Sequence, residues 1–215
     1  LRQLSQRSLR LGEIDQALDR GGALLTRVGN QSNLILDPDL DSYYTMSLVV
    51  LRYPELLNVI HRIGVHLSQP SEVSDLRTQY LVLEGQLDAT ARGINSDYSE
   101  AVAASPTPLL RQGLEPSQLR LRQQMEAFRR AARELIDLGV TPAAVSRVTM
   151  TRRELIEALD QVGQCGVHML EEGKSYLIPN HQNVESFLGC CDDASRLFHE
   201  MKAVLGPEDS ASATH

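Results

Sequence analysis

The stretch Leu36–Asp41, with the sequence LDPDLD, predicts the start of a helix and is the clearest boundary in the chain. Proline suits the first helical position because its φ angle is already helical and its missing N–H is not needed there. Pro38 is therefore the expected first residue of a helix, and Asp37 is its expected N-cap. Asp39 and Asp41 add negative charge to the first turn, where the helix dipole favours it.

A second proline, Pro54, falls inside this helix, which we expect to continue to about Leu67. A proline at this position cannot donate a hydrogen bond to the carbonyl of Val50, and its ring crowds that carbonyl. The sequence therefore predicts a kink at Pro54.

Outward from this helix, apolar residues recur at steps of three and four, and no stretch alternates with period two between turns. The pattern predicts helices at about 1–33, 38–67, 71–102, 116–138, 142–176 and 184–204. Proline and glycine connectors separate them at 69–71, at 104–108 with an extension over 113–116, and around Gly139. Long amphipathic helices with short connectors predict an all-α fold, an elongated up-and-down bundle of five to six helices that resembles a four-helix bundle.

The predicted organisation has three parts. Residues 1–178 form the helical-bundle domain, 179–205 form a C-terminal helix of undefined role, and 206–215 form a disordered tail of small and polar residues.

Composition narrows the function classes. The 215 residues are 42% hydrophobic and 23% charged with a net charge of −7, which indicates a globular protein and argues against general nucleic-acid binding. No apolar run has the roughly 18 residues that a membrane span needs. The three cysteines, Cys165, Cys190 and Cys191, are an odd number and form no disulfide framework. No enzyme motif is present, so we expect a non-catalytic protein without a cofactor.

Two groups of residues are candidates for binding chemistry. The pair Tyr43–Tyr44, near Asp37 and the following acids, could line a ligand pocket. The alternative, which the capping pattern favours, is a capped helix start with one tyrosine packed and one half-exposed. Cys165, His168 and Glu172 share a helix face and could form a partial metal site. Glycines around them weaken that helix, so we favour a packing role and expect no metal.

The block from Leu24 to Leu57 has a distinctive sequence. Its segments VGNQSNLILDPDLDSYYTM, from Val28 to Met46, and LVVLRYPELL, from Leu48 to Leu57, resemble the extracytoplasmic helical sensor regions of methyl-accepting chemotaxis proteins. Related sensor histidine kinases and diguanylate cyclases carry this segment too. The chain departs from the family pattern at Thr45 and Ser47, where the family usually has Leu and Asp.

The resemblance implies a ligand-sensing input domain of a bacterial transmembrane receptor, located in the periplasm and dimerising along long helices. It implies a small molecule or a periplasmic binding protein as the ligand, and membrane spans in the parent protein that this chain does not contain. We expect Tyr43, Tyr44, Asp37 and Arg52 to contact the ligand. The alternative is a soluble helical scaffold or interaction protein derived from such a receptor, because the sequence after Tyr176 continues through Pro179 without a span.

Overall fold

The structure is a computed structural model, and it describes residues 14, 16–24, 27, 39–68 and 73–173. The chain divides into two compact units, one made of Leu36–Pro179 and the other of Leu1–Ile35 with Asn180–His215. Residues 16–24 of the second unit are helical. The predictions for 174–215, including the last helix and the tail, lie outside the described residues.

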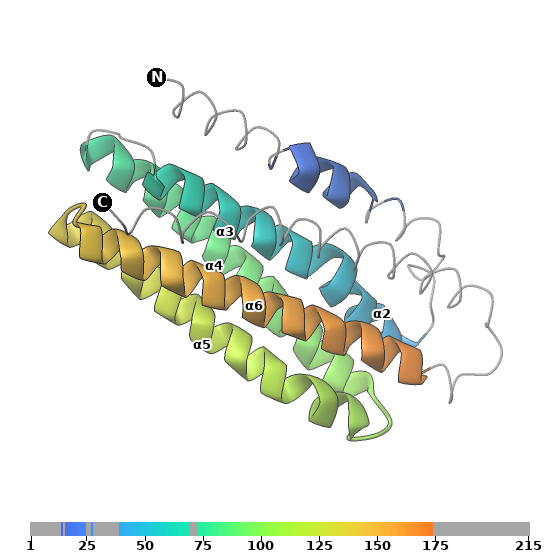
Figure 1. Cartoon of the computed structure of the whole chain (residues 1–215). Coiled ribbons are helices and arrows are strands. Elements are labelled where there is room, and N and C mark those ends of the chain that lie inside the picture. The colour runs from blue at the N-terminus through green and yellow to red at the C-terminus, as the bar shows by residue number, and fades with distance from the viewer. Residues whose placement is uncertain (1–13, 15, 25–26, 28–38, 69–72, 174–215) are drawn as a thin grey trace, which may run out of the picture. The chain divides into compact units, whose positions relative to one another are not determined.

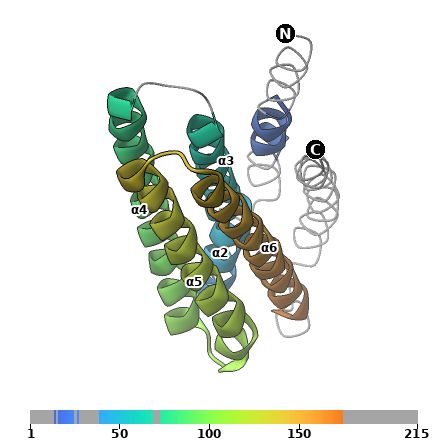
Figure 2. The same cartoon turned by 60° about the vertical axis from the view of Figure 1, so that its left-hand side comes forward.

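Four long helical rods lie side by side in the unit Leu36–Pro179 (Figures 1 and 2). The first rod is one continuous run of helix from residue 40 to residue 68 that changes type twice. The elements are α2 (Leu40–Ser47), the π-helical turn η2 (Leu48–Arg52), α3 (Tyr53–Ser68), α4 (Val73–Ala104), α5 (Leu109–Leu138) and α6 (Pro142–Gly173). No strand occurs among the residues described, which confirms the predicted all-α bundle.

The unit is elongated along its helices and has an up-and-down course. Helices α4, α5 and α6 have 32, 30 and 32 residues, and helices of that size are about 45 to 48 Å long. Only the residues 105–108 join α4 to α5, and 139–141 join α5 to α6. Such short connectors require each helix to run back along the one before it.

The connector between α5 and α6 forms as the sequence predicted. Gly139 has a φ of 96°, a left-handed conformation that a residue without a Cβ adopts readily, and its N–H donates to the Leu135 carbonyl at 3.1 Å. Thr141 caps α6, because its hydroxyl accepts a hydrogen bond from the Ala144 N–H at 3.2 Å.

The predicted start of α5 was wrong. The sequence predicts a connector that extends over 113–116, but α5 begins at Leu109 and passes through Pro116. Pro116 is exposed, so water can reach the carbonyl that loses its helical partner. Gly113 also lies inside the helix, where it leaves room for the Met169 side chain of α6.

Helix α2 begins at Leu40, with Asp39 as its N-cap residue. The Asp39 carbonyl accepts hydrogen bonds from the Tyr43 N–H at 3.0 Å and from the Ser42 hydroxyl at 2.9 Å. Asp37 and Pro38, at which the sequence placed the helix start, lie outside the described residues.

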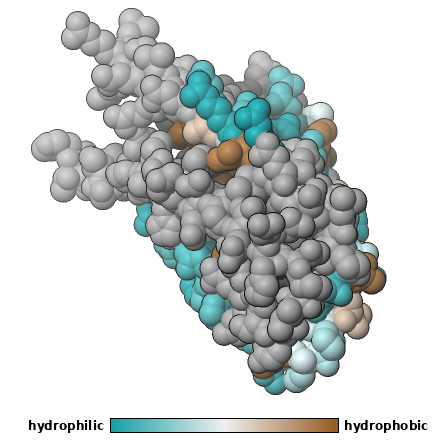
Figure 3. Space-filling model, turned by 90° about the vertical axis from the view of Figure 1, so that its right-hand side faces the viewer, coloured by the Kyte–Doolittle hydropathy of each residue, from teal (hydrophilic) through white to brown (hydrophobic). Residues whose placement is uncertain are grey.

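Aliphatic side chains from every rod fill the core. Its largest fully buried side chains are Phe128, Leu48, Leu56, Ile60, Ile63, Leu87, Ile94, Leu114, Leu121, Leu135 and Leu155. Each contributes on the order of 1.5–3 kcal/mol through the apolar surface it removes from water. On the face shown in Figure 3, the described residues in view are mostly hydrophilic, with hydrophobic residues in small groups.

Candidate functional site

The π-helical turn η2 interrupts the first rod just before Pro54. The Tyr53 N–H donates to the carbonyl of Leu48, five residues earlier, in place of the usual partner four residues earlier. The sequence predicts a kink at Pro54, and the structure has this wider helical turn directly before the proline. One extra residue is thereby accommodated ahead of the proline, and π turns of this kind are frequent at functional sites.

The wide turn brings two side chains onto one acceptor. The Ser47 hydroxyl and the Arg52 Nε each donate to the same carboxylate oxygen, Oδ2 of Asp97 on α4, at 2.8 Å. Residues five apart are about 140° apart around a regular α-helix, but only about 50° apart in a π turn, which places them on one side of the helix. The shared contact with Asp97 therefore depends on the π geometry.

This cluster reaches from the core to the surface. Asp97 is only 6% exposed, whereas the side chain of Arg52 is 35% exposed. Arg52 also forms a longer ion pair, in which its Nη1 lies 3.7 Å from the carboxylate of the exposed Glu55. The hydrogen bond to Asp97 is the main cause that raises the pKa of Arg52, so its guanidinium stays charged. Arg52 thus links a buried carboxylate to solvent.

Two glycines leave room for the side chains of η2. A Cβ on Gly93 of α4 would lie 2.9 Å from Cζ and Nη1 of Arg52. A Cβ on Gly166 of α6 would lie 2.6 Å from Cγ2 of Val49. A larger residue at position 166 would press on the short branched side chain of Val49, whereas the long side chain of Arg52 can move away from one at position 93.

A second polar group lies in the core beside the π turn. The amide of Gln118 on α5 donates to the hydroxyl of Tyr53, and the residue Tyr53 is only 3% exposed. Burial, with smaller effects from Cys165 and Tyr98, raises the pKa of Tyr53 well above its usual range. The Tyr98 hydroxyl is also buried and has no hydrogen-bond partner, and burial raises its pKa too.

The predicted tyrosine pair lies nearer the start of the same rod. The rings of Tyr43 and Tyr44 meet edge to face, with centroids 5.2 Å apart and planes at 79°, and both side chains are half-buried. Eight residues separate Tyr44 from Arg52, which is about 12 Å along a helix. The structure therefore places the tyrosines and Arg52 at two levels of one rod. Asp37, the fourth predicted residue, lies outside the described residues.

The candidate metal ligands lie on α6. The sulfur of Cys165 shares a hydrogen bond of 3.3 Å with the hydroxyl of Ser117 on α5, which links the two helices. His168 is exposed, and the side chain of Glu172 and the pair Cys190–Cys191 lie outside the description. Among the described residues, no three His, Cys, Asp or Glu side chains are grouped so that they could hold a metal ion.

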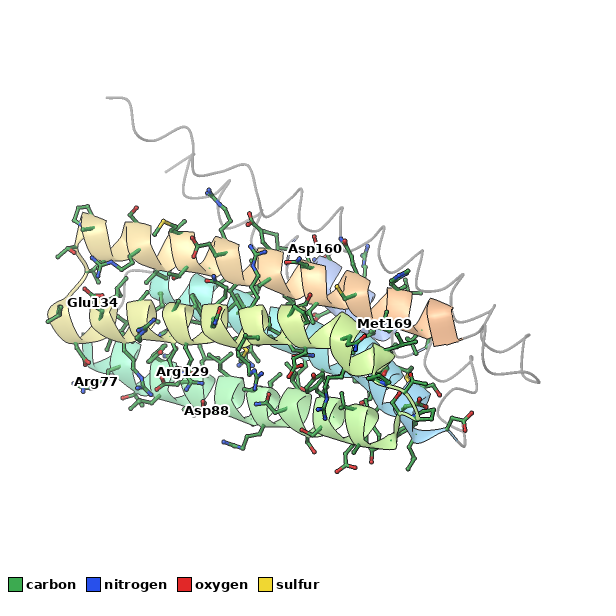
Figure 4. All side chains as sticks on the ribbon, turned by 90° about the horizontal axis from the view of Figure 1, so that it is seen from below. Arg77, Asp88, Arg129, Glu134, Asp160 and Met169 are labelled. Carbon is green, nitrogen blue, oxygen red and sulfur yellow. The ribbon has the colours of Figure 1, made fainter. Side chains whose placement is uncertain are left out.

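Another buried carboxylate ties α4 to α5. Glu84 accepts hydrogen bonds from the Tyr80 hydroxyl at 3.2 Å and from Arg133 Nε at 2.6 Å. Arg129 lies 4.0 Å from Glu84 and also pairs with Asp88, toward which it points in Figure 4. A third acid, Glu126, lies 3.3 Å from Arg129. Glu84 and Arg129 each have more than one partner, so this cluster is best explained as a structural link between two helices.

Sequence reasoning selected Arg52 but missed its partners. Asp97 lies three residues after Ile94 and four before Ala101, both buried, so it occupies a core position of α4. A charged residue at a core position is rare unless it is paired, and this was the available signal. Ser47 was noted only as a departure from the family pattern. A hydroxyl can donate to Asp97, whereas an aspartate at that position could not.

Comparisons with protein-family models, curated proteins and solved structures found no match to the chain. Within the described part of the chain, no helix is both long enough and apolar enough to cross a membrane.

Proposed function

We propose that the unit Leu36–Pro179 is the core of a non-catalytic, ligand-sensing input domain of a bacterial transmembrane receptor. The observation that carries the proposal is Arg52, a half-exposed cation anchored on the buried carboxylate of Asp97. It stands in the block that resembles receptor sensor regions. A ligand that contacts Arg52 at the surface would act directly on a contact in the core.

The ligand chemistry follows from Arg52. A guanidinium presents several donors in a plane and suits carboxylates and phosphates, and Asp97 engages only Nε at hydrogen-bond distance. The contact with Glu55 is long and exposed, so an anionic ligand could replace it at small cost. We therefore propose a small anion at Arg52. The tyrosine pair about 12 Å away would contact only a larger ligand or a partner protein.

The remaining parts of the proposal come from the resemblance. They are a periplasmic location, dimerisation along the long helices, and a small molecule or a periplasmic binding protein as the ligand. The long continuous helices support the proposal, because packed helices transmit small displacements over their whole length.

A thermal-shift screen of the purified chain tests the function. The compounds are amino acids, organic acids, amines, purines and inorganic anions. A ligand at a hundred times its Kd adds about 2.7 kcal/mol and raises the Tm by a few degrees. Organic acids, acidic amino acids or inorganic anions should give the shift, and no shift with any class would contradict direct sensing.

Matched variants locate the binding site of a hit. Arg52→Gln should abolish the shift, whereas Arg62→Gln should retain it, because Arg62 is an exposed arginine of the same rod that bonds Gln86 at 2.7 Å. The double change Tyr43→Phe with Tyr44→Phe should weaken the response of a large ligand only. A shift that survives Arg52→Gln unchanged would contradict the assignment of the site.

A further inference from the structure

We propose that η2 is a two-state register device and that Asp97 holds it in the π state. In this state Ser47 and Arg52 share one oxygen of Asp97. The inference rests on the proposed function for its biological purpose, because it concerns the regulation of the same site. The two registers of η2 are properties of the chain without a ligand.

The π state needs support from outside the helix. A π turn has poorer intrinsic stability than an α turn, and it persists where surrounding contacts favour it. Asp97 provides such a contact only when Ser47 and Arg52 are stacked, as they are in η2. If the turn became α-helical, these two side chains would point about 140° apart and one of them would lose Asp97.

The second state follows from helix geometry. Conversion of η2 to an α turn, with every residue kept, shifts the register of the preceding segment by one residue, which is a rotation of about 100° and a translation of about 1.5 Å. The segment that would move is short, because α2 has only eight residues. This segment carries Tyr43 and Tyr44, so loss of the contact between Arg52 and Asp97 would change the surroundings of the tyrosine pair.

The trigger is competition for Arg52. An anion that draws the guanidinium away from Asp97 removes one of the two hydrogen bonds that select the π state. Gly93 and Gly166 provide space for the π-state positions of Arg52 and Val49, so the packing on both sides is compatible with this state. Loss of the Asp97 contact therefore shifts the balance away from the π state, while the burial of Met46 on α2 still favours it.

Fluorine NMR of the chain labelled with 3-fluorotyrosine tests the device without any ligand. Signals are assigned by single Tyr→Phe changes. Asp97→Asn should shift or split the signals of Tyr43 and Tyr44 and leave the signal of Tyr80 unchanged, because Tyr80 bonds Glu84 in the other polar cluster. Ser47→Ala should act in the same direction with a smaller change.

Deletion of Leu51 provides the matched control. Leu51 lies in η2 and is 51% exposed, so its removal should convert the π turn to an α turn without changing the core faces on either side. In that background Asp97→Asn should no longer affect the tyrosine pair. The proposal is overturned if Asp97→Asn and Ser47→Ala both leave the signals of Tyr43 and Tyr44 in place in a folded chain. It is also overturned if the deletion leaves the effect of Asp97→Asn unchanged.

The two proposals can fail separately. The NMR experiment contains no ligand, so a negative result removes the register device and leaves the screen as a test of sensing. If the thermal-shift screen finds no ligand but the NMR result is positive, the register device stands and an anion at Arg52 is not its trigger.

Discussion

Two prolines lie inside long helices of this bundle, and the helices respond differently. Pro116 is exposed on α5, and the helix passes through it without a change of type. Pro54 is half-buried, and a π turn precedes it on a rod that packs against α4 and α6. A free carbonyl on a wet surface can bond water, whereas a defect in a packed layer must be accommodated by neighbouring side chains. The difference indicates that η2 is built from tertiary contacts and not from the proline alone.

The largest difference is expected from deleting one residue in each of the two rods that contain these prolines. Deletion of Gln123 turns the rest of α5 by about 100° and moves Met125 and Phe128 off the core face, so the chain should lose more than about 4 kcal/mol or fail to fold. Deletion of Leu51 should cost at most about 1–2 kcal/mol, because the π turn already contains an extra residue. Urea unfolding followed by circular dichroism measures both. Equal losses would show that η2 does not have the spare residue.

The next effect concerns the two partners of the π-turn ion pair. Arg52→Ala leaves Asp97 buried without its cation and should cost about 2–3 kcal/mol, a value reduced for the solvent exposure of Arg52. Asp97→Ala leaves an arginine that can turn to water and should cost only about 1 kcal/mol. Chemical denaturation of both variants checks this order, and a larger loss for Asp97→Ala would contradict it.

A smaller effect is expected in the second polar cluster. Glu84→Ala removes the acceptor of Tyr80 and Arg133, but Arg129 keeps Asp88 and Glu126. Because partners remain, we expect a loss of about 1–2 kcal/mol, less than for Arg52→Ala. A double variant with Arg133→Ala should add little, since the two residues share one contact. Additive losses would show that the contact between Arg133 and Glu84 does not contribute to stability.

The fold followed from the sequence more fully than the site did. Apolar spacing located the helices, and Gly139 and Thr141 marked one connector, because these features act through local geometry. The start of α5 was missed because a proline on an exposed face is tolerated. The Ser47–Asp97 contact joins residues 50 apart in sequence, and it forms only in a π turn that no local pattern announces.

The last effect is expected only at alkaline pH. Burial raises the pKa of Tyr53 above the value of about 10 that it has in the unfolded chain. Its contribution to stability is therefore complete below pH 10 and is lost as the pH rises towards the folded pKa, by up to about 1.4 kcal/mol per pH unit. Denaturation at pH 9, 10 and 11 should show this slope, and Tyr53→Phe should reduce it. An unchanged slope in that variant would assign the effect to other tyrosines.

Amide hydrogen exchange of the unmodified chain compares the two prolines most directly. The backbone amides of 48–53 should exchange at least ten times faster than those of 117–122, which follow Pro116 in α5, because a turn with two registers opens more often than a regular helix. Slow exchange in α5 together with fast exchange in η2 would support the register device. Equal protection of the two segments, or slower exchange in η2, would contradict it.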